Sequence, residues 1–533
     1  MGTSAPRKIE KVEDLVALEV LLMKMLDQGQ ISETVEFAET LEGEQALVAR
    51  FQALVFTEAG SLAGDTALLQ RGAEGWRKLD DEADPIVSYN LANAELELWN
   101  LASKGHRYVT AFETAHQHLR KARDLFERVG WDAECPTNLR VQALTNLGNS
   151  FDNLGREHEA YRCWSEATRL DPSFGMAHGN VGMALAHVAG LLNQHAPTAR
   201  RNAALALDKA LADRERVLHI GGPVALERFE KTRAELPSKV SPAEPAVEAP
   251  WADPYLEWCR RNELFLHLSP SCQREDDGDL DPLYISRFSS GLDPADEERA
   301  KNVFDAFNAT KQDYLAARYS TWLAIDPASP IHAHSTAVSA RATFLDTLEY
   351  GRWGVRTGMA TSAFAAATNV LDKIANFVHL YFGTARRHTD VYFRSIWYPR
   401  SKQGKMDQEF VEAIEPPRGN RGLIALFDLA CELERETRLA EFVNQRHTAT
   451  HRFLVVHAMD PVISSNERLD RVVWDDLIEA SIEQLAITRA AIIYLARTID
   501  INEALIAHSD EREGRVRAPL TFPRVDSDLA EID

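Results

Sequence analysis

The sequence Asn146-Leu147-Gly148 returns 34 residues later as Asn180-Val181-Gly182, and this recurrence decides the fold of the first part of the chain. Phe151 and Leu185 keep the same offset from the two copies. The glycine in each copy lets two helices approach closely, while the large apolar residues fill the space between them. A single helix pair cannot bury its own apolar face. The recurrence therefore predicts several helix pairs that stack on one another.

The residues between the two copies resemble a tetratricopeptide repeat. Ala160, Trp164, Ala167 and Pro172 stand at the offsets that are typical of this repeat. Small Ala160 permits close helix packing, Trp164 fills the space beside Leu147, and Pro172 ends the second helix. The resemblance implies a helical solenoid with a concave surface that binds a peptide or protein partner.

Apolar residues at helical spacing continue on both sides of this repeat, and no run of alternating strands interrupts them. In the first part they cover residues 12–26, 45–62, 85–101 and 112–129. In the second part they cover residues 296–325, 333–353, 362–382, 423–436, 437–457 and 474–506. Because these segments are all helical in period, we predict an all-α protein.

The length and charge of the chain restrict its organisation and its partners. A chain of 533 residues is too long for one core and predicts two or three domains. The formal net charge of −22 excludes a general nucleic-acid binder, so any RNA site must be a local basic island. No apolar run is long enough to span a bilayer, and the first residues lack the apolar core of a signal peptide. We therefore expect a cytoplasmic protein.

The cysteines are scattered and form no C-x-x-C pair. They are Cys135, Cys163, Cys259, Cys272 and Cys431. We interpret them as reduced thiols packed in helices, because their spacing does not suit a zinc site. We expect no metal and no cofactor.

Residues 237–254 contain five prolines and few bulky apolar side chains, which indicates a linker. This places a tetratricopeptide-like domain at residues 1–236, a second helical domain at 255–508 and a tail at 509–533. An acidic run at 276–281 follows the linker. It lacks the spacing of a calcium loop, and we interpret it as a solvated turn.

One short stretch, Asn444-Gln-Arg-His-Thr-Ala-Thr-His451, brings together the groups needed to cut a phosphodiester without a metal. Arg446 is a phosphate anchor, and His447 and His451 are proton-transfer groups. On a helix the two histidines share a face, whereas Arg446 is rotated by about 140° from His451. Arg-His pairs at this spacing also arise by chance, so the surroundings of the motif decide its meaning.

These surroundings resemble a HEPN domain (higher eukaryote and prokaryote nucleotide-binding), in the bacterial branch that follows tetratricopeptide-like repeats. Three stretches carry the resemblance, at 255–266, 371–377 and 446–453. The family signature is Arg followed by a polar residue, then His after four to six intervening positions. Here the follower is His447, where Asn is more common. The resemblance covers residues 255–507 and implies a helical bundle.

The resemblance also implies an activity. It implies a metal-independent ribonuclease with Arg446, His451 and His447 as catalytic residues, in a composite site at a homodimer interface. RNA and not DNA would be the substrate, because a ribose 2′-hydroxyl attacks the phosphorus and leaves a 2′,3′-cyclic phosphate. The family context implies a toxin-like or defence role in which the N-terminal repeats receive a signal.

Other interpretations of the same residues remain open. His447 and His451 are one helical turn apart and can be metal ligands, although no nearby Cys or H-E-x-x-H pattern completes a site. The three residues can also be ordinary helix residues. In that case the chain is a non-catalytic scaffold whose bundle only dimerises or binds a nucleotide.

A basic segment at 386–405, rich in aromatic residues, favours RNA binding. Arg386, Arg387 and Arg394 are our candidates for phosphate contacts, because aromatic rings between them can stack on unpaired bases. Those rings are Tyr392, Phe393, Trp397 and Tyr398. Equally, they can pack on the bundle. Asp372 and Lys373 lie on an otherwise apolar helix, where they support the site, form an internal ion pair or lie on a solvated edge.

Overall fold

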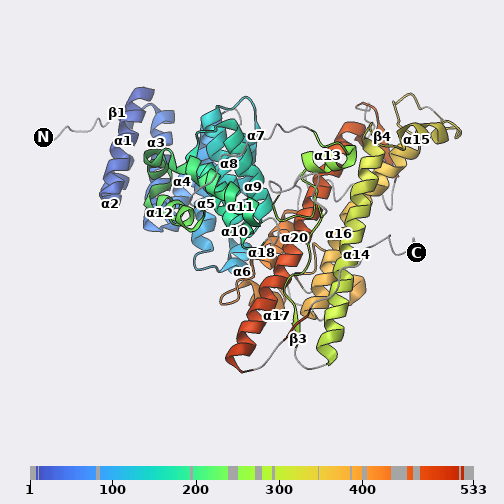
Figure 1. Ribbon diagram of the computed structural model, residues 1–533. Coiled ribbons are helices and arrows are strands. Elements are labelled where there is room, and N and C mark those ends of the chain that lie inside the picture. Colours follow the sequence, from blue (N-terminus) through green and yellow to red (C-terminus); the bar gives the residue numbers. More distant parts are fainter. Residues whose placement is uncertain are drawn as a thin grey trace. The chain divides into compact units, whose positions relative to one another are not determined.

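The structure is a computed structural model, and the chain divides into two compact units that are described separately (Figure 1). The first unit comprises Met1–Leu191 and Ala196–Val240, and the second comprises Leu192–His195 and Ser241–Asp533. The structure describes residues 8–9, 11–79, 84–191, 196–237, 250–269, 279–290, 294–345, 347–384, 387–398, 405–433, 453–459, 469–514 and 518–520.

The described part of the first unit is helical apart from one short parallel strand pair. Its elements are β1 (Lys8–Ile9), α1 (Val12–Asp27), α2 (Ile31–Glu39), β2 (Glu42–Gly43), α3 (Gln45–Ala63), α4 (Thr66–Leu79), α5 (Pro85–Ala102), α6 (Tyr108–Thr114), α7 (His116–Trp131), α8 (Thr137–Asp152), α9 (Glu157–Leu170), α10 (Gly175–Ala189), α11 (Ala196–Leu211) and α12 (Arg214–Glu235). Helices pack as the pairs α3–α4, α5–α7, α8–α9 and α10–α11, and α4–α5, α7–α8 and α9–α10 join neighbouring pairs. This arrangement agrees with a stack of helix pairs.

The repeated asparagine makes the same contact in both copies. Asn146 Nδ2 on α8 donates to Asn93 Oδ1 on α5 at 2.9 Å. Asn180 Nδ2 on α10 donates to Asn149 Oδ1 on α8 at 2.8 Å. Amide pairs therefore join successive first helices, and Leu147 lies in the same buried cluster as the second copy's apolar residues.

Gly148 on α8 is the position where the close approach of α8 and α9 demands a missing side chain. A β-carbon there would collide with the Trp164 ring, whose Nε1 donates to the Thr145 carbonyl at 3.2 Å. We expect Gly148→Ala to destabilise the first unit by about 1–3 kcal/mol, because the packed ring cannot move without strain. Hydrogen exchange of the α8 and α9 amides measures this loss.

The control for this variant is Gly358→Ala on α16, where an added β-carbon meets no atom within 4 Å. Removing an unneeded helical glycine should leave stability unchanged or raise it by about 0.5–1 kcal/mol. Equal protection of α8 in wild type and Gly148→Ala would show that the ring yields freely.

The described part of the second unit contains three long helices, several short ones and two strand pairs. Its elements are α13 (Pro254–Arg261), β3 (Ser289–Ser290), α14 (Pro294–Ile325), α15 (His332–Ser339), α16 (Val355–Phe382), the 3-10 turn η2 (His388–Asp390), α17 (Gln408–Ile414), α18 (Arg421–Leu433), β4 (Phe453–His457), β5 (Leu469–Val473), α20 (Trp474–Arg512) and β6 (Ala518–Pro519). The predicted all-α class is confirmed.

The core of the second unit lies between α14, α16 and α20, which pack against one another, with α18 on α20 (Figure 1). Every residue of α18 from Gly422 to Cys431 is buried. Gly422 permits this because its backbone approaches Tyr494 and Thr498 too closely for a side chain. Asn420 fixes the start of α18, accepting from the Leu423 amide at 3.1 Å and donating to the Thr498 carbonyl at 2.9 Å.

Two predicted helices are wrong in part. The helix expected at 333–353 ends at Ser339, and Leu348 (φ 62°) and Tyr350 (φ 57°) adopt a left-handed backbone that no helix tolerates. Of the helix expected at 437–457, Phe453–His457 form strand β4 instead, and residues 437–452 lie outside the described residues. The sequence Phe-Leu-Val-Val-His is rich in β-branched and aromatic residues, and this composition favours a strand.

None of the described helices is both long enough and apolar enough to cross a lipid bilayer. Cys135, Cys163, Cys259 and Cys431 are free thiols, and burial raises the pKa of Cys163 and of Cys259 to about 12. Cys272 lies outside the described residues.

Candidate functional site

The predicted catalytic residues Arg446, His447 and His451 lie outside the residues that the structure describes. The described elements on either side are α18, which ends at Leu433, and β4, which begins at Phe453. Both elements belong to the second unit. They are the described elements that flank the candidate residues along the chain.

Strand β4 is held in a parallel ladder with β5. Five residue pairs form the register, from Phe453 with Leu469 to His457 with Val473. Val456 and Val472 are buried, which fixes the face of the ladder that packs on the unit. The chain then passes directly from Val473 into α20. The end of the candidate segment is thereby tied to the longest helix.

A loop between α15 and α16 adds a third backbone to this ladder. Gly351 bridges His457, the Arg352 amide donates to the Val456 carbonyl at 2.7 Å, and the Ala458 amide donates to the Tyr350 carbonyl at 2.9 Å. The buried His457 ring places Nδ1 2.7 Å from the Glu349 carbonyl. His457 is therefore part of the fold and does not face solvent.

The predicted RNA contacts are only partly described. Arg386 lies outside the described residues, Arg387 is exposed and Arg394 is half-buried. Phe393 and Trp397 are buried, and the Trp397 ring packs on other aromatic rings of the core. These two rings therefore pack on the bundle and present no free face for bases. Tyr392 is half exposed, and Tyr398 packs on Phe427.

The charged pair on the apolar helix α16 also has a structural explanation. Asp372 Oδ1 accepts from the Phe393 amide at 3.0 Å and so fixes the segment that follows η2. Lys373 forms an ion pair with Asp313 of α14. Lys373 therefore forms an ion pair, as one interpretation held, but its side chain is 47% exposed and the pair lies at a solvated edge.

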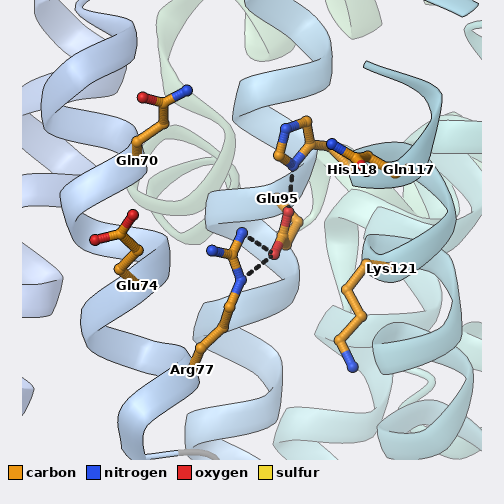
Figure 2. A pocket seen from close by; sticks show the side chains of 7 residues that line it. All are labelled: Gln70, Glu74, Arg77, Glu95, Gln117, His118 and Lys121. Carbon is orange, nitrogen blue, oxygen red and sulfur yellow. Dashed lines mark hydrogen bonds and ion pairs between the residues drawn. The ribbon is translucent and has the colours of Figure 1, made fainter. Parts of the chain in front are cut away.

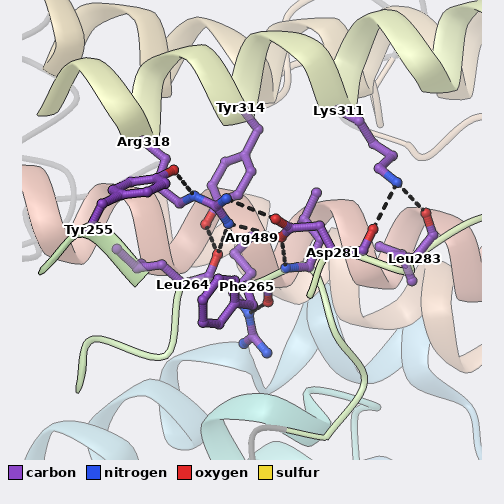
Figure 3. A network of polar contacts seen from close by, with 10 residues as sticks. Tyr255, Leu264, Phe265, Asp281, Leu283, Lys311, Tyr314, Arg318 and Arg489 are labelled. Atoms are coloured by element: carbon purple, nitrogen blue, oxygen red, sulfur yellow. Dashed lines mark hydrogen bonds and ion pairs between the residues drawn. The ribbon is translucent and has the colours of Figure 1, made fainter. Parts of the chain in front are cut away.

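A buried polar network joins four residues that we name the polar clasp: Asp281, Lys311, Arg318 and Arg489 (Figure 3). Arg318 on α14 donates to both Asp281 oxygens at 2.9 and 2.8 Å and to the Leu264 carbonyl at 2.9 Å. Burial opposes the Asp281 charge, yet the Arg318 guanidinium outweighs it and lowers the pKa of Asp281. This carboxylate therefore does not belong to a solvated turn, and that expectation is wrong for Asp281.

The other two members of the polar clasp bind backbone. Arg489 on α20 donates to the Phe265 carbonyl at 2.5 Å and to the His267 carbonyl at 2.9 Å. Lys311 on α14 donates to the Leu283 carbonyl at 2.6 Å, and burial lowers its pKa. The clasp therefore fastens the segment before α14 onto α14 and α20 (Figure 3). Its cations are directed at backbone and at Asp281, so its role is structural.

The first unit contains an open polar pocket of about 540 Å³ between α4, α5 and α7 (Figure 2). At its base lies the buried side chain of Glu95. Its Oε1 accepts from Arg77 Nη2 at 2.8 Å, and its Oε2 lies 2.6 Å from His118 Nδ1. Burial raises the pKa of Glu95, but His118 and Arg77 outweigh it and lower the pKa. The rest of the lining is polar: Gln70, Glu74, Gln117 and Lys121.

The geometry of the second unit defines a class, a helical bundle that carries a short parallel ladder beside its longest helix. Residues 295–502 match the family model of the LA2681-like HEPN domain. The second unit therefore carries a HEPN domain, and the match includes two of the three stretches that predicted it, at 371–377 and 446–453. HEPN domains are associated with ribonuclease activity, RNA binding and dimer formation. No curated protein matches the chain.

Proposed function

We propose that the chain is a metal-independent endoribonuclease whose catalytic residues are Arg446, His447 and His451. The observation that carries the proposal is that the family match, residues 295–502, encloses all three. Guanidinium and imidazole groups at this spacing are what a metal-free phosphodiester cut requires. The ladder of β4 and β5 supports the proposal, because it anchors Phe453, which follows His451 by two residues.

The proposed reaction transfers two protons, forms a bond between the 2′-oxygen and phosphorus, and breaks the bond between phosphorus and the 5′-oxygen. One imidazole removes the proton of a ribose 2′-hydroxyl, and that oxygen attacks the adjacent phosphorus. Arg446 binds the phosphate and stabilises the additional negative charge of the transition state. A second imidazole, from His447 or from the partner copy's His451, gives its proton to the departing 5′-oxygen. The products are a 2′,3′-cyclic phosphate and a 5′-hydroxyl.

A composite site explains how the two kinds of group meet. On one helix Arg446 and His451 point about 140° apart, so a single copy would not present them side by side. A two-fold homodimer through the HEPN domain brings two copies of the motif into one cleft. Arg446 of one copy then acts beside His451 of the other.

The first unit would control this activity as a sensor or docking domain, in a toxin-like or defence effector. Its polar pocket supports a protein or peptide partner, since amide and charged side chains such as Gln117 and Lys121 recognise backbone and charge together. The signal that this unit receives would release or restrain cleavage in the second unit.

A cleavage assay on the full-length protein tests the proposal. We expect single-stranded RNA to be cut in the presence of EDTA, and the same strand with deoxyribose throughout to stay intact. Arg446→Ala should cut at least about a hundredfold more slowly, because the transition-state charge loses its partner. If wild type and variant are equally inert on every RNA, the non-catalytic scaffold is the better account. Cleavage that stops with EDTA would indicate a metal-dependent enzyme.

A further inference from the structure

The loop between α15 and α16 exposes aromatic rings that a folded chain normally buries. Tyr350 is 61% exposed, Phe344 49% and Trp353 46%. The Phe344 and Trp353 rings lie nearly parallel, at 12° with 6.3 Å between centroids. Exposed aromatic side chains gathered in one place mark a binding surface.

This loop is held in a strained and fixed shape. Leu348 and Tyr350 have positive φ angles, which cost about 1–2 kcal/mol each for residues other than glycine. Tyr350 and Arg352 are nevertheless fixed by their backbone hydrogen bonds with β4. The Val355 amide donates to Ser339 Oγ at 2.9 Å, which closes the other end. A ligand would therefore meet rings that are already in position.

Two guanidinium groups lie over one indole ring beside these aromatic residues. The Arg352 guanidinium carbon is 4.3 Å from the Trp474 ring centroid, and that of Arg356 is 6.0 Å away. Arg356 also donates to the Ala324 carbonyl at 2.9 Å and to the Ile325 carbonyl at 3.2 Å. Both side chains are half-buried and so remain reachable from solvent.

No carboxylate among the described residues forms an ion pair with Arg352 or Arg356, in contrast to Arg318, which has Asp281. Burial and then the charge of Arg352 lower the pKa of Arg356, and the more weakly acting charge of Asp326 opposes this shift. An anion bound between the two would relieve this repulsion, and a phosphate is the anion that guanidinium groups bind best.

The loop is bridged to a residue that lies close along the chain to the proposed catalytic segment. Gly351 bridges His457, and His457 follows His451 by six residues. Even a fully extended chain keeps those two α-carbons within about 20 Å. A strand of RNA that contacts the loop is therefore within a few nucleotides of His451.

We propose that Tyr350, Arg352, Trp353 and Arg356 form a binding surface for single-stranded RNA, with bases on the two rings and a phosphate between the two guanidinium groups. That this RNA is also the substrate rests on the proposed function. The adjacent Leu345 and Leu348 are each 84% exposed, and they would suit a protein partner instead. Because these leucines have neither a ring nor a charge, replacing them should affect binding of a protein partner and not binding of RNA.

Binding is measured with the full-length His451→Ala protein, which removes cleavage, and a fluorescently labelled single-stranded RNA. We expect Tyr350→Ala with Trp353→Ala to weaken binding about tenfold or more, because two stacking platforms are lost. Arg352→Gln with Arg356→Gln should reduce the slope of log affinity against log salt by about 1, since one phosphate contact is lost. Glutamine removes the positive charge and still offers hydrogen-bond donors to neighbouring carbonyls.

The matched control is Leu345→Ser with Leu348→Ser, which should bind RNA as the parent protein does. If the ring and arginine variants bind like the parent while the leucine variant lowers the molecular mass of the assembly, the loop is a protein interface and the proposal fails. The catalytic proposal is judged separately. RNA that binds through this surface to an otherwise inert wild type overturns the nuclease and leaves the surface standing. If the ring variant binds RNA like its His451→Ala parent, and the same two substitutions in the wild-type background leave the cutting rate unchanged, the surface alone is overturned.

Discussion

Replacing Asp281 with alanine should lower the local stability of the second unit by about 3–5 kcal/mol, because Arg318 would remain buried without its counter-charge. The Leu266 amide would also lose its acceptor, Asp281 Oδ1 at 2.6 Å. Hydrogen exchange of the Leu266 and Leu283 amides reports this directly. We expect their protection to fall by a factor of roughly 10²–10³.

Two further variants test whether the loss of stability comes from the unpaired charge of Arg318. Asp281→Ala combined with Arg318→Met should recover part of the lost protection, since no unpaired charge is then buried. Lys301→Ala removes an exposed partner of Glu297 on the same helix and should change nothing measurable. Unchanged exchange in Asp281→Ala would show that the polar clasp does not hold this segment.

The pH dependence of the effect of Asp281→Ala follows from the direction in which the pKa of Asp281 is shifted. The pKa of Asp281 is lowered from its ordinary value of 3.8 by Arg318, which outweighs burial. Its contribution to stability is therefore complete above that value and is lost as the pH falls through the lower pKa of the folded state. The difference in stability between wild type and Asp281→Ala should become smaller in strong acid.

His451→Ala should reduce RNA cleavage by about 10²–10⁴-fold, the usual contribution of a general acid or base. The matched control is His508→Ala, an exposed histidine on α20, which should cut at the wild-type rate. His447→Ala distinguishes the two sources of the second proton. A comparable loss assigns the acid to His447, and a small loss assigns it to the partner copy's His451.

Mixing two inactive variants tests the composite site. Arg446→Ala and His451→Ala, each inert alone, should form mixed dimers that retain one intact pairing of Arg446 with His451. Random assortment makes half of the dimers mixed, and each has one working site of two, so about a quarter of wild-type activity should return. If His447 is the acid, no return in a mixture shown to exchange subunits would place both groups of one site in a single copy. If the partner copy's His451 is the acid, each site needs both His451 side chains and the mixed dimers should stay inactive.

The sequence anticipated the parts of the fold that repeat locally. Gly148 and Trp164 face each other as the repeat predicted. This contact was predictable because the helical period and the spacing of small residues can be recognised within about 20 neighbouring positions. The long helices α14, α16 and α20 followed from the same helical period, whereas the HEPN assignment came from the resemblance of short stretches to that family. Element boundaries failed where backbone strain or a ladder overrode the period, at Tyr350 and at Phe453.

Contacts between distant residues could not be read in this way. Asp281 meets Arg318 across 37 positions, and Arg489 meets His267 across 222. A signal was nevertheless present, since Lys311 and Arg318 interrupt the buried face of a long helix two turns apart. The exposed rings near Trp353 were missed because a helix was expected there, and a helix would have turned them inward.

The direct passage from β5 into α20 limits how the second unit can move. No residue separates Val473 from Trp474, so a sliding displacement of the helix would drag the strand along its neighbour. Such a shift by one position would turn Val472 outward and break the pairing with β4. Any switching in this unit must therefore proceed by rigid hinging or by assembly of copies, and not by a ratchet of its longest helix.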